Sequence, residues 1–337
     1  MKILITGVHG FVGSNLVKCL ASANEIYGLD IIAPVKEGVA HTFSWDEIDE
    51  VHGSGLMVNG SPLEIDAIIH LAGKAHDTKN QSAAEVYFKL NTGLTQKIFD
   101  WYLAHPTAKK FIQFSTVKSA ADRVEGEFLT EECIPTPVGP YGESKIAAEN
   151  YIIKKFAPEA LKRPFHNFTD EDAVVDGKKV YIMRPCMIHG PGNKGNLNLL
   201  YNVVKKGIPY PLGAFENKRT FTSIGNICFA VEGVLEKDVP SGIYNMGDDE
   251  ALSTNELIEE ICKSLGKKAH IWRLPKGLMN GVAMIGGMLH LPLNPDRLQK
   301  LTENYVSSNA KIKAALGVKK MPVDARKGLM VTLDSFK

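Results

Sequence analysis

The sequence from Lys2 to Gly13 reads KILITGVHGFVG and decides the fold class. Its first residues form a short apolar run that predicts a buried strand, and the stretch Phe11 to Ala23 after the glycine turn predicts a helix. In this arrangement the backbone N–H groups and the helix dipole can approach a pyrophosphate. The spacing of Gly7, Gly10 and Gly13 is G-x-x-G-x-x-G, and a turn before an ordinary helix without a ligand is the alternative explanation.

A carboxylate ends the second expected strand, Glu25 to Asp30. Asp30 comes 20 residues after Gly10, where its side chain can accept hydrogen bonds from the hydroxyls of a nucleotide ribose. A carboxylate there repels a 2′-phosphate, so the sequence favours NAD(H) over NADP(H). We expect Phe11 and Val12 at the helix start, and Ile31 after the carboxylate, to complete the dinucleotide site.

Short apolar runs and longer amphipathic stretches alternate through the first half of the chain. This alternation predicts βαβ units and therefore a doubly wound parallel sheet in an α/β fold. Further strands are expected at 66–72, 110–115 and 180–184, and helices at 83–105, 141–156, 197–206 and 253–265. We expect a dinucleotide-binding domain over 1–185, rejoined by about 222–250, and a smaller α/β substrate-binding domain over 186–337. The polar stretch 158–179 is interpreted as a surface insertion.

Composition excludes several classes of protein. The 337 residues carry a formal net charge of +1, and the lysine doublets are scattered, so no nucleic-acid partner is expected. The five cysteines lie far apart with no C-x-x-C pair, which predicts reduced core thiols and no redox or zinc site. His70, His76 and His189 form no metal-binding motif, so we predict no metal. The first apolar run is too short for a signal-peptide core, and we therefore expect a cytoplasmic protein.

One segment differs from the rest of the chain because it lacks charged residues. Residues 277–295 contain no Asp, Glu, Lys or Arg, but three glycines, Asn280 and Pro292 interrupt the run, so no membrane span is expected. We interpret it as a buried or partner-facing helix, with membrane contact as the alternative.

Tyr141 and Lys145 form the candidate acid/base pair. They lie four residues apart at the start of an expected helix, so their side chains share one face. A lysine cation beside a phenol favours the phenolate, and we therefore expect Lys145 to lower the pKa of Tyr141 from about 10. Thr116 follows a strand at the carboxyl edge of the same sheet, where its hydroxyl can hold a substrate oxygen against Tyr141. A surface ion pair without function is the alternative for a lone Tyr-x-x-x-Lys.

The ordered motifs resemble those of the extended short-chain dehydrogenase/reductases, the nucleotide-sugar epimerase/dehydratase family. They are TGVHGFVG at 6–13, HLAG at 70–73, NTG at 91–93, FST at 114–116, PYGESK at 140–145, and RP at 184–185 before HGPG at 189–192. The resemblance implies a Rossmann-type fold and a homodimer. It also implies that Tyr141 is the acid/base, Lys145 binds the nicotinamide ribose and Thr116 completes the triad. The expected cofactor lining then includes the remaining positions Leu71, Ala72, Gly73, Asn91 and Pro185.

The second half resembles the family's binders of UDP-sugars. By this resemblance Asn196 and Leu197 contact the diphosphate, Pro211 lies on the segment that faces the uracil, and Arg219 and Arg297 bind phosphate. A solvated charge is the alternative for either arginine.

The residues after Thr116 bear on the reaction. In nucleotide-sugar 4,6-dehydratases an Asp-Glu pair follows the hydroxyl residue, whereas here Val117 and Lys118 follow it, so dehydration is disfavoured. The stretch Lys194 to Arg219 resembles a bacterial subgroup that acts on UDP-N-acetylamino sugars for surface polysaccharide. The leading hypothesis is reduction of a UDP-4-keto-6-deoxy-N-acetylhexosamine at C4. The alternatives are a UDP-hexose or UDP-N-acetylhexosamine 4-epimerase that retains NAD, and a catalytically silent NAD-sensing scaffold.

Overall fold

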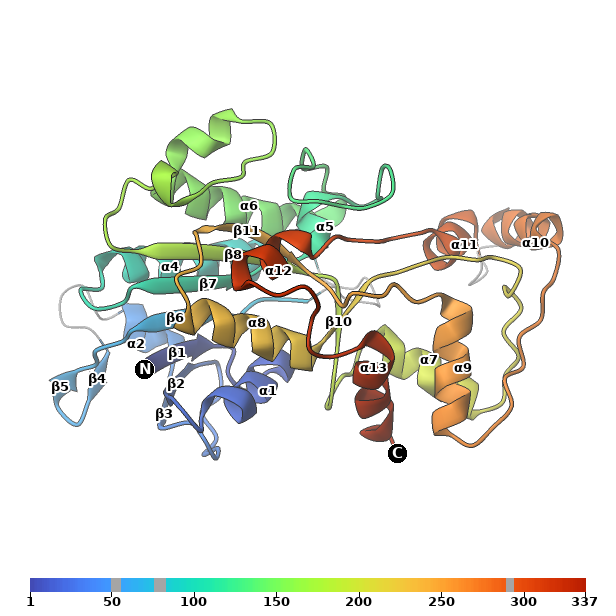
Figure 1. Cartoon of the computed structure of the whole chain (residues 1–337), viewed down its shortest axis with the longest axis horizontal. Coiled ribbons are helices and arrows are strands. Elements are labelled where there is room, and N and C mark those ends of the chain that lie inside the picture. The colour runs from blue at the N-terminus through green and yellow to red at the C-terminus, as the bar shows by residue number, and fades with distance from the viewer. Residues whose placement is uncertain (50–55, 76–82, 289–293) are drawn as a thin grey trace.

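A seven-stranded sheet forms the centre of the protein (Figure 1). The computed structural model describes residues 1–49, 56–75, 83–288 and 294–337. The strands, in spatial order, are β11 (Gly242–Met246), β8 (Lys179–Pro185), β7 (Lys110–Phe114), β6 (Ala67–His70), β1 (Lys2–Thr6), β2 (Glu25–Leu29) and β3 (His41–Phe43). Every neighbouring pair is parallel, which confirms the predicted fold class.

Helices cover both faces of this sheet because successive strand residues point to opposite sides. Ile3 and Ile5 of β1 pack against one group of helices, and Leu4 between them packs against the other. The first group is α1 (Phe11–Leu20), α8 (Ile224–Glu236) and α12 (Ala310–Leu316). The second group is α2 (Trp45–Asp49), α4 (Leu94–Ala104) and α6 (Gly139–Phe156).

A smaller part extends from the carboxyl edge of the sheet (Figure 1). It holds the parallel strands β9 (Met187–His189) and β10 (Phe221–Ser223), and α7 (Asn196–Lys205), α9 (Thr254–Ser264) and α13 (Ala325–Asp334) share one apolar cluster there. The helices α10 (Lys276–Met288) and α11 (Pro295–Thr302) pack on each other around Leu212. The remaining elements are β4 (Met57–Val58), β5 (Ser61–Pro62), α3 (Ala84–Tyr87), the π-helical turn η1 (Phe88–Gly93), α5 (Val117–Ala120), and the 3₁₀ turns η2 (Pro158–Lys162) and η3 (Asp170–Asp172).

Two expectations about the first half need correction. The single helix expected over 83–105 is α3, η1 and α4 in succession, because a π-helical turn interrupts it. The stretch 158–179 is not only a surface insertion: Phe168 is buried in the core, and its ring lies edge-on to Phe156 with the ring centroids 5.8 Å apart. The segment therefore covers the core at the C-terminal end of α6.

The cysteines also differ from the expectation. Cys19 of α1 and Cys228 of α8 form a disulfide, so the prediction that all five are reduced thiols is wrong. Cys133, Cys186 and Cys262 are free. The paired cysteines lie 209 residues apart in sequence, and only the packing of α8 against α1 on the same face of the sheet brings them together.

The uncharged segment begins with α10, and its residues 289–293 lie outside the described part of the chain. Met279, Ala283 and Gly286 of α10 are buried, as expected for a helix packed on one side. Over the residues that the structure describes, no helix combines the length and the apolar character needed to cross a membrane.

Candidate functional site

The glycine turn after β1 is built for close backbone approach. Gly7 has φ +68°, a conformation that L side chains rarely adopt, and a Cβ placed on Gly13 would lie 2.4 Å from the Gly7 carbonyl oxygen. Gly10 is the N-cap residue of α1, and as a glycine it brings no side chain to cap the helix. The N–H groups of the first helical turn, from Phe11, Val12 and Gly13, thus lack helix partners and face the carboxyl edge of the sheet.

Asp30 lies directly after β2 at the same edge. Its carboxylate accepts hydrogen bonds from the backbone N–H groups of His9 at 3.0 Å and Ile31 at 2.8 Å. These bonds hold the carboxylate next to the glycine turn. Ile31 itself is largely exposed, so its side chain lies at the rim.

A buried network fixes the turn from Leu71 to Gly73. The Thr6 hydroxyl accepts hydrogen bonds from the N–H groups of Leu71 at 3.1 Å and Ala72 at 3.0 Å, and it lies 2.6 Å from His70 Nδ1. On the other side of the ring, His70 Nε2 is 3.0 Å from the Thr95 hydroxyl, which donates to a backbone carbonyl. His70 must therefore donate from Nε2 and accept at Nδ1, so the ring is neutral. Burial lowers the pKa of His70 to about 3, which keeps it neutral at physiological pH.

The π-helical turn carries Asn91 into this site. Asn91 is fully buried; its Oδ1 accepts from the Lys74 N–H at 2.7 Å and its Nδ2 donates to the Ser144 hydroxyl at 3.0 Å. A Cβ on Gly73 would lie 2.6 Å from Asn91 Oδ1 and 3.5 Å from Lys145 Nζ. Gly73, Asn91 and Lys145 are thus close neighbours, and π-helical turns often mark functional sites.

Tyr141 and Thr116 meet where β7 and α6 converge. Their side chains are hydrogen bonded, and the Tyr141 ring lies edge-on to Tyr87 with centroids 6.3 Å apart. Burial raises the pKa of Tyr141, the hydrogen bond from Thr116 lowers it, and Tyr87 raises it further. The net shift is upward, so the expectation that Lys145 lowers the pKa of Tyr141 is wrong for this structure. The tyrosine is held as a protonated phenol.

Lys145 is buried one helical turn after Tyr141. Its Nζ donates to the Phe114 carbonyl at 3.0 Å, at the end of β7. Burial lowers the pKa of Lys145 to about 8, and the carboxylate of Glu149 acts in the opposite direction. The ammonium therefore points toward the strand end rather than the phenol, which explains why the Tyr141 pKa is not lowered.

Glu149 and Arg184 form a fully buried ion pair beneath the site. Arg184 Nε lies 3.1 Å from Glu149 Oε2, and the carboxylate also accepts from the hydroxyls of Ser115 and Ser119. This network ties the end of β7 to α6 and β8. Neither residue could be given this role from the sequence, although Arg184 belongs to the RP motif at 184–185.

Removing one partner of this pair should strongly destabilise the fold. Glu149→Leu leaves the Arg184 guanidinium buried without its carboxylate, and we expect a loss of about 3–5 kcal/mol in the free energy of unfolding, measured by urea titration. The control is Glu149→Leu combined with Arg184→Met, which removes both charges and should lose less. Equal losses in the two variants would show that the charges are not what matters.

Arg219 lies in the smaller part just before β10, where its backbone pairs with Leu252 and Tyr305. Its Nη2 donates to the Lys300 carbonyl of α11, whereas its buried Nε has no hydrogen-bond partner among the described residues. Burial lowers the pKa of Arg219, which means that its surroundings do not fully compensate the charge. A partly buried cation with an unsatisfied N–H is suited to an anionic ligand.

The other residues expected to contact the substrate differ in their exposure. Asn196 is exposed at the start of α7, but the Leu197 side chain is buried in the apolar cluster, so only its backbone can face a ligand. Pro211 lies on the segment that pairs with 271–273, and Arg297 is exposed in the first turn of α11, the helix that Arg219 contacts. Pro185 ends β8 opposite Met246.

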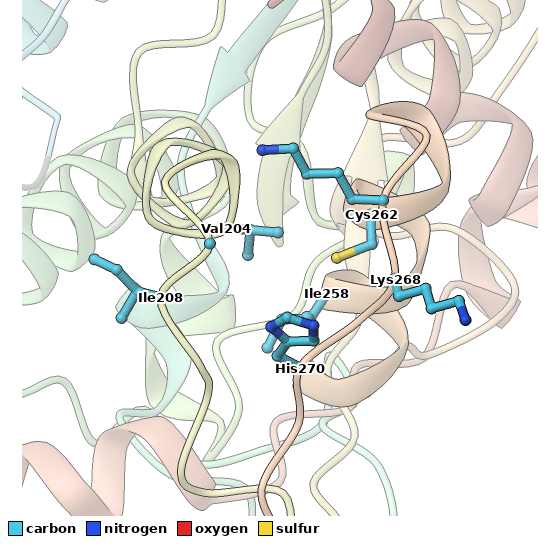
Figure 2. A pocket seen from close by; sticks show the side chains of 8 residues that line it. Val204, Ile208, Ile258, Cys262, Lys268 and His270 are labelled. Atoms are coloured by element: carbon cyan, nitrogen blue, oxygen red, sulfur yellow. The ribbon is translucent and has the colours of Figure 1, made fainter.

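A cavity of about 240 Å³ lies elsewhere, between α7 and α9 (Figure 2). It is lined by residues of the two helices and of the segments that follow them: Val204, Ile208, Ile258, Cys262, Lys268 and His270. It shares no residue with the expected site, so we assign it no part in the chemistry. Within the described residues, no group of three His, Cys, Asp or Glu could hold a metal ion; His76 lies outside them.

Comparison with known proteins identifies the family of this chain. The model of the NAD dependent epimerase/dehydratase family matches residues 3–247, and the chain belongs to that family of nucleotide-sugar enzymes. The family inferred from the sequence motifs is thereby confirmed.

Relatives with assigned activities include two 4-epimerases. The UDP-glucose 4-epimerase of Vibrio cholerae is 29% identical over 81% of this chain and 78% of that protein. The N-acetyl-alpha-D-glucosaminyl-diphospho-ditrans,octacis-undecaprenol 4-epimerase of Escherichia coli O157:H7 is 26% identical over 93% and 84%. Among solved structures, the UDP-glucuronic acid 4-epimerase of Bacillus cereus in complex with NAD superposes with a TM-score of 0.68 at 21% identity, covering 100% of this chain and 98% of that one.

Proposed function

We propose that this protein reduces the 4-keto group of a UDP-4-keto-6-deoxy-N-acetylhexosamine with NADH. The observation that carries the proposal is the hydrogen-bonded pair of Thr116 and a protonated Tyr141 at the carboxyl edge of the sheet. Reduction of a ketone needs a proton donor for the oxygen, and a phenol with a raised pKa is in the donor state at neutral pH. The resemblance of Lys194 to Arg219 to enzymes of UDP-N-acetylamino sugars supports the substrate class.

The residues present fit a nicotinamide dinucleotide. The uncapped first turn of α1 and the crowded glycines beneath it suit a pyrophosphate, and the Asp30 carboxylate suits the ribose hydroxyls of NAD better than a 2′-phosphate. The turn at Leu71 to Gly73, Asn91 and Pro185 would line the nicotinamide half. When bound, the cofactor supplies the hydride for the sugar carbon.

Side chains of the protein then supply the proton and orient the C4 oxygen of the sugar. Tyr141 Oη donates its proton to the C4 oxygen, and the Thr116 hydroxyl holds that oxygen in line with it. Lys145, whose Nζ donates to the Phe114 carbonyl at the strand end, would hold the nicotinamide ribose and so keep the cofactor in place beside Tyr141. The proton returns to Tyr141 from solvent before the next turnover.

The surroundings of Lys118 argue against dehydration. Lys118 occupies a position where dehydratases carry an acid of the Asp-Glu pair, and here its Nζ lies 3.1 Å from Asp122 Oδ1 and 4.3 Å from the Tyr305 ring centroid. Its charge is therefore engaged away from the sugar, and the extra acid and base that elimination of water requires are not supplied at 117–118.

A 4-epimerase is the second candidate, and the activities of the two relatives named above favour it. The same Tyr141 would first remove the proton of the C4 hydroxyl, and the keto sugar would rotate before reduction on its other face. By their names, both relatives act on a sugar that is linked to a diphosphate. In one the diphosphate belongs to UDP, and in the other it joins the sugar to undecaprenol. An epimerase retains its NAD through turnover, whereas a reductase exchanges it every cycle.

Cofactor handling separates the two candidates. We would denature the purified protein, measure the dinucleotide it releases, and follow NADH absorbance after adding the UDP-4-keto-6-deoxy sugar. Little bound NAD and stoichiometric oxidation of NADH support the reductase. Tightly bound NAD without net oxidation overturns it, and interconversion of UDP-N-acetylglucosamine or of its undecaprenyl-diphosphate counterpart would then establish the epimerase. Running the assay with NADPH tests the preference set by Asp30.

Arg219 provides a test of the diphosphate site. Arg219→Met removes the half-buried cation, and we expect KM for the UDP-sugar to rise more than about tenfold, as for loss of a charge-assisted contact, with little change in NADH binding. The neighbouring Lys218→Met is the control, because Lys218 is exposed. If both variants kept the wild-type KM, the diphosphate would have to bind elsewhere.

The oligomeric state is a separate proposal: by its resemblance to the family, the protein forms a homodimer.

A further inference from the structure

The exposed face of α10 is unusually apolar. Leu278, Met284, Ile285 and Met288 each expose more than half of their side-chain surface, and Val282 exposes 44%. On a helix these positions form one continuous arc, because Leu278, Val282 and Ile285 follow at i, i+4 and i+7 and the two methionines lie beside them. We call this arc the apolar face of α10. Such a contiguous patch marks an interaction surface.

The chain that leads into this face is rich in positive charge. Residues 261–288 contain five Lys or Arg and no Asp or Glu: Lys263, which forms an ion pair with Glu260 at 3.7 Å, and Lys267, Lys268, Arg273 and Lys276. The neighbouring helix α11 carries Arg297 and Lys300 beside Asp296, and Glu303 follows it. Trp272, on the segment between α9 and α10, is 55% exposed.

These features lie along one edge of the protein. Figure 1 shows that the segment from α9 to α10 and then α10 itself form the end of the molecule farthest from β4 and β5. The helix is anchored there from its other side, where Met279 and Ala283 pack on Leu212 and Leu298. The apolar face is thus presented outward on a fixed support, with a groove of about 390 Å³ between α10 and α11 beside it.

We propose that the apolar face of α10 and the basic segment before it dock the protein on an anionic membrane surface. A second protein copy would bury the apolar face but would also bring the same positive charges together, whereas anionic lipid satisfies both features. Lysine and arginine beside an exposed tryptophan and an apolar helix are typical of proteins that lie in the bilayer interface. α10 inserts only its outer face, in the plane of the interface.

This inference is independent of the proposed reaction. It rests on the apolar face and the basic residues of 261–288, and the docking assay measures binding without turnover. A failed docking experiment therefore leaves the reductase proposal intact, and a failed turnover experiment leaves the docking surface intact.

The test is co-sedimentation of the full chain with vesicles. We expect binding to vesicles of phosphatidylglycerol and phosphatidylcholine in equal amounts, weaker binding as salt is raised, and little binding to phosphatidylcholine alone. Leu278→Glu combined with Ile285→Glu should reduce the bound fraction at least about tenfold, because it places charge in the apolar face. The matched control is Val331→Glu, an equally exposed apolar residue on α13, which should bind like the wild type.

Two further measurements guard the interpretation. The circular dichroism spectrum and the melting temperature should be the same in the double variant and the wild type, which shows that the variant is folded. Vesicle binding should shift the tryptophan emission to shorter wavelength, and Trp272→Phe should remove most of that shift. If the wild-type protein does not bind anionic vesicles, the proposal is overturned. So does a double variant that only converts a dimer to a monomer in sedimentation velocity, since the face would then join two copies.

Discussion

Replacing Tyr141 by phenylalanine should lower kcat about a thousandfold, within the range for loss of a general acid. The ring remains, so its edge-on packing against Tyr87 is kept, and only the hydroxyl that is hydrogen bonded to Thr116 is lost. NADH binding should change little, because the first turn of α1 and Asp30 are untouched. Turnover is measured by NADH absorbance and binding by fluorescence of the reduced cofactor.

This variant also decides between an enzyme and a silent scaffold. The control is Tyr87→Phe, which removes the hydroxyl of the neighbouring ring and should leave turnover within a few-fold of the wild type. Wild-type turnover by Tyr141→Phe would mean that another group donates the proton. A protein with no turnover in any form, but with unaltered NADH binding, would be a dinucleotide sensor on the same fold.

Replacing Lys145 by methionine should lower kcat by about a hundredfold and flatten the pH profile. The pKa of Lys145 is lowered to about 8. The ammonium is therefore present below that pH and is lost as the pH rises through it, so kcat of the wild type should fall above about pH 8. The variant has no ammonium to lose, and its residual rate should not show that fall.

The pH profile distinguishes this role from a structural one. Lys145→Arg keeps the positive charge at every accessible pH, so it should retain more activity than the methionine variant at high pH. A methionine variant whose rate still fell above pH 8 would show that another group titrates there, with Tyr141 the first to examine.

The parallel sheet could be predicted because its signals are local. The apolar run of β1, the glycine turn and α1 follow one another within 20 residues, and β6 and β7 are likewise short apolar runs with helical segments after them. The short strand β3 carries no such signal and was not predicted. The carboxyl ends of parallel strands share one edge, so Asp30, Gly73 and Thr116 could be expected at that edge from their strand positions alone.

The electrostatics of the site could not be predicted in the same way. The spacing of Tyr141 and Lys145 places them on one face of α6, but the direction of the lysine depends on the Phe114 carbonyl, which comes from β7. Burial then outweighs other influences on the phenol. Similarly, Asn91 in the π-helical turn hydrogen bonds with Lys74 and Ser144. These partners lie on other segments, so the spacing of residues around Asn91 does not indicate them.

Contacts between distant segments account for the other differences. The pairing of Cys19 with Cys228 follows from the packing of α8 on α1, and nothing in the spacing of the cysteines indicates it. Leu197 fits an amphipathic helix as well as a ligand contact, and only the cluster formed with α9 and α13 decides that its side chain is buried.

The position of β11 at the edge of the sheet has a consequence for synthesis on the ribosome. A nascent chain that has emerged only as far as Pro185 already contains β8 and its neighbour β7, but the strand on the other side of β8, Gly242–Met246, has not yet been made. Until then β8 offers an unpaired row of N–H and C=O groups, and α1 lacks the cover of α8. The nascent sheet is thus most open to wrong pairing over the time needed to translate about 60 residues, at the usual rate a matter of seconds.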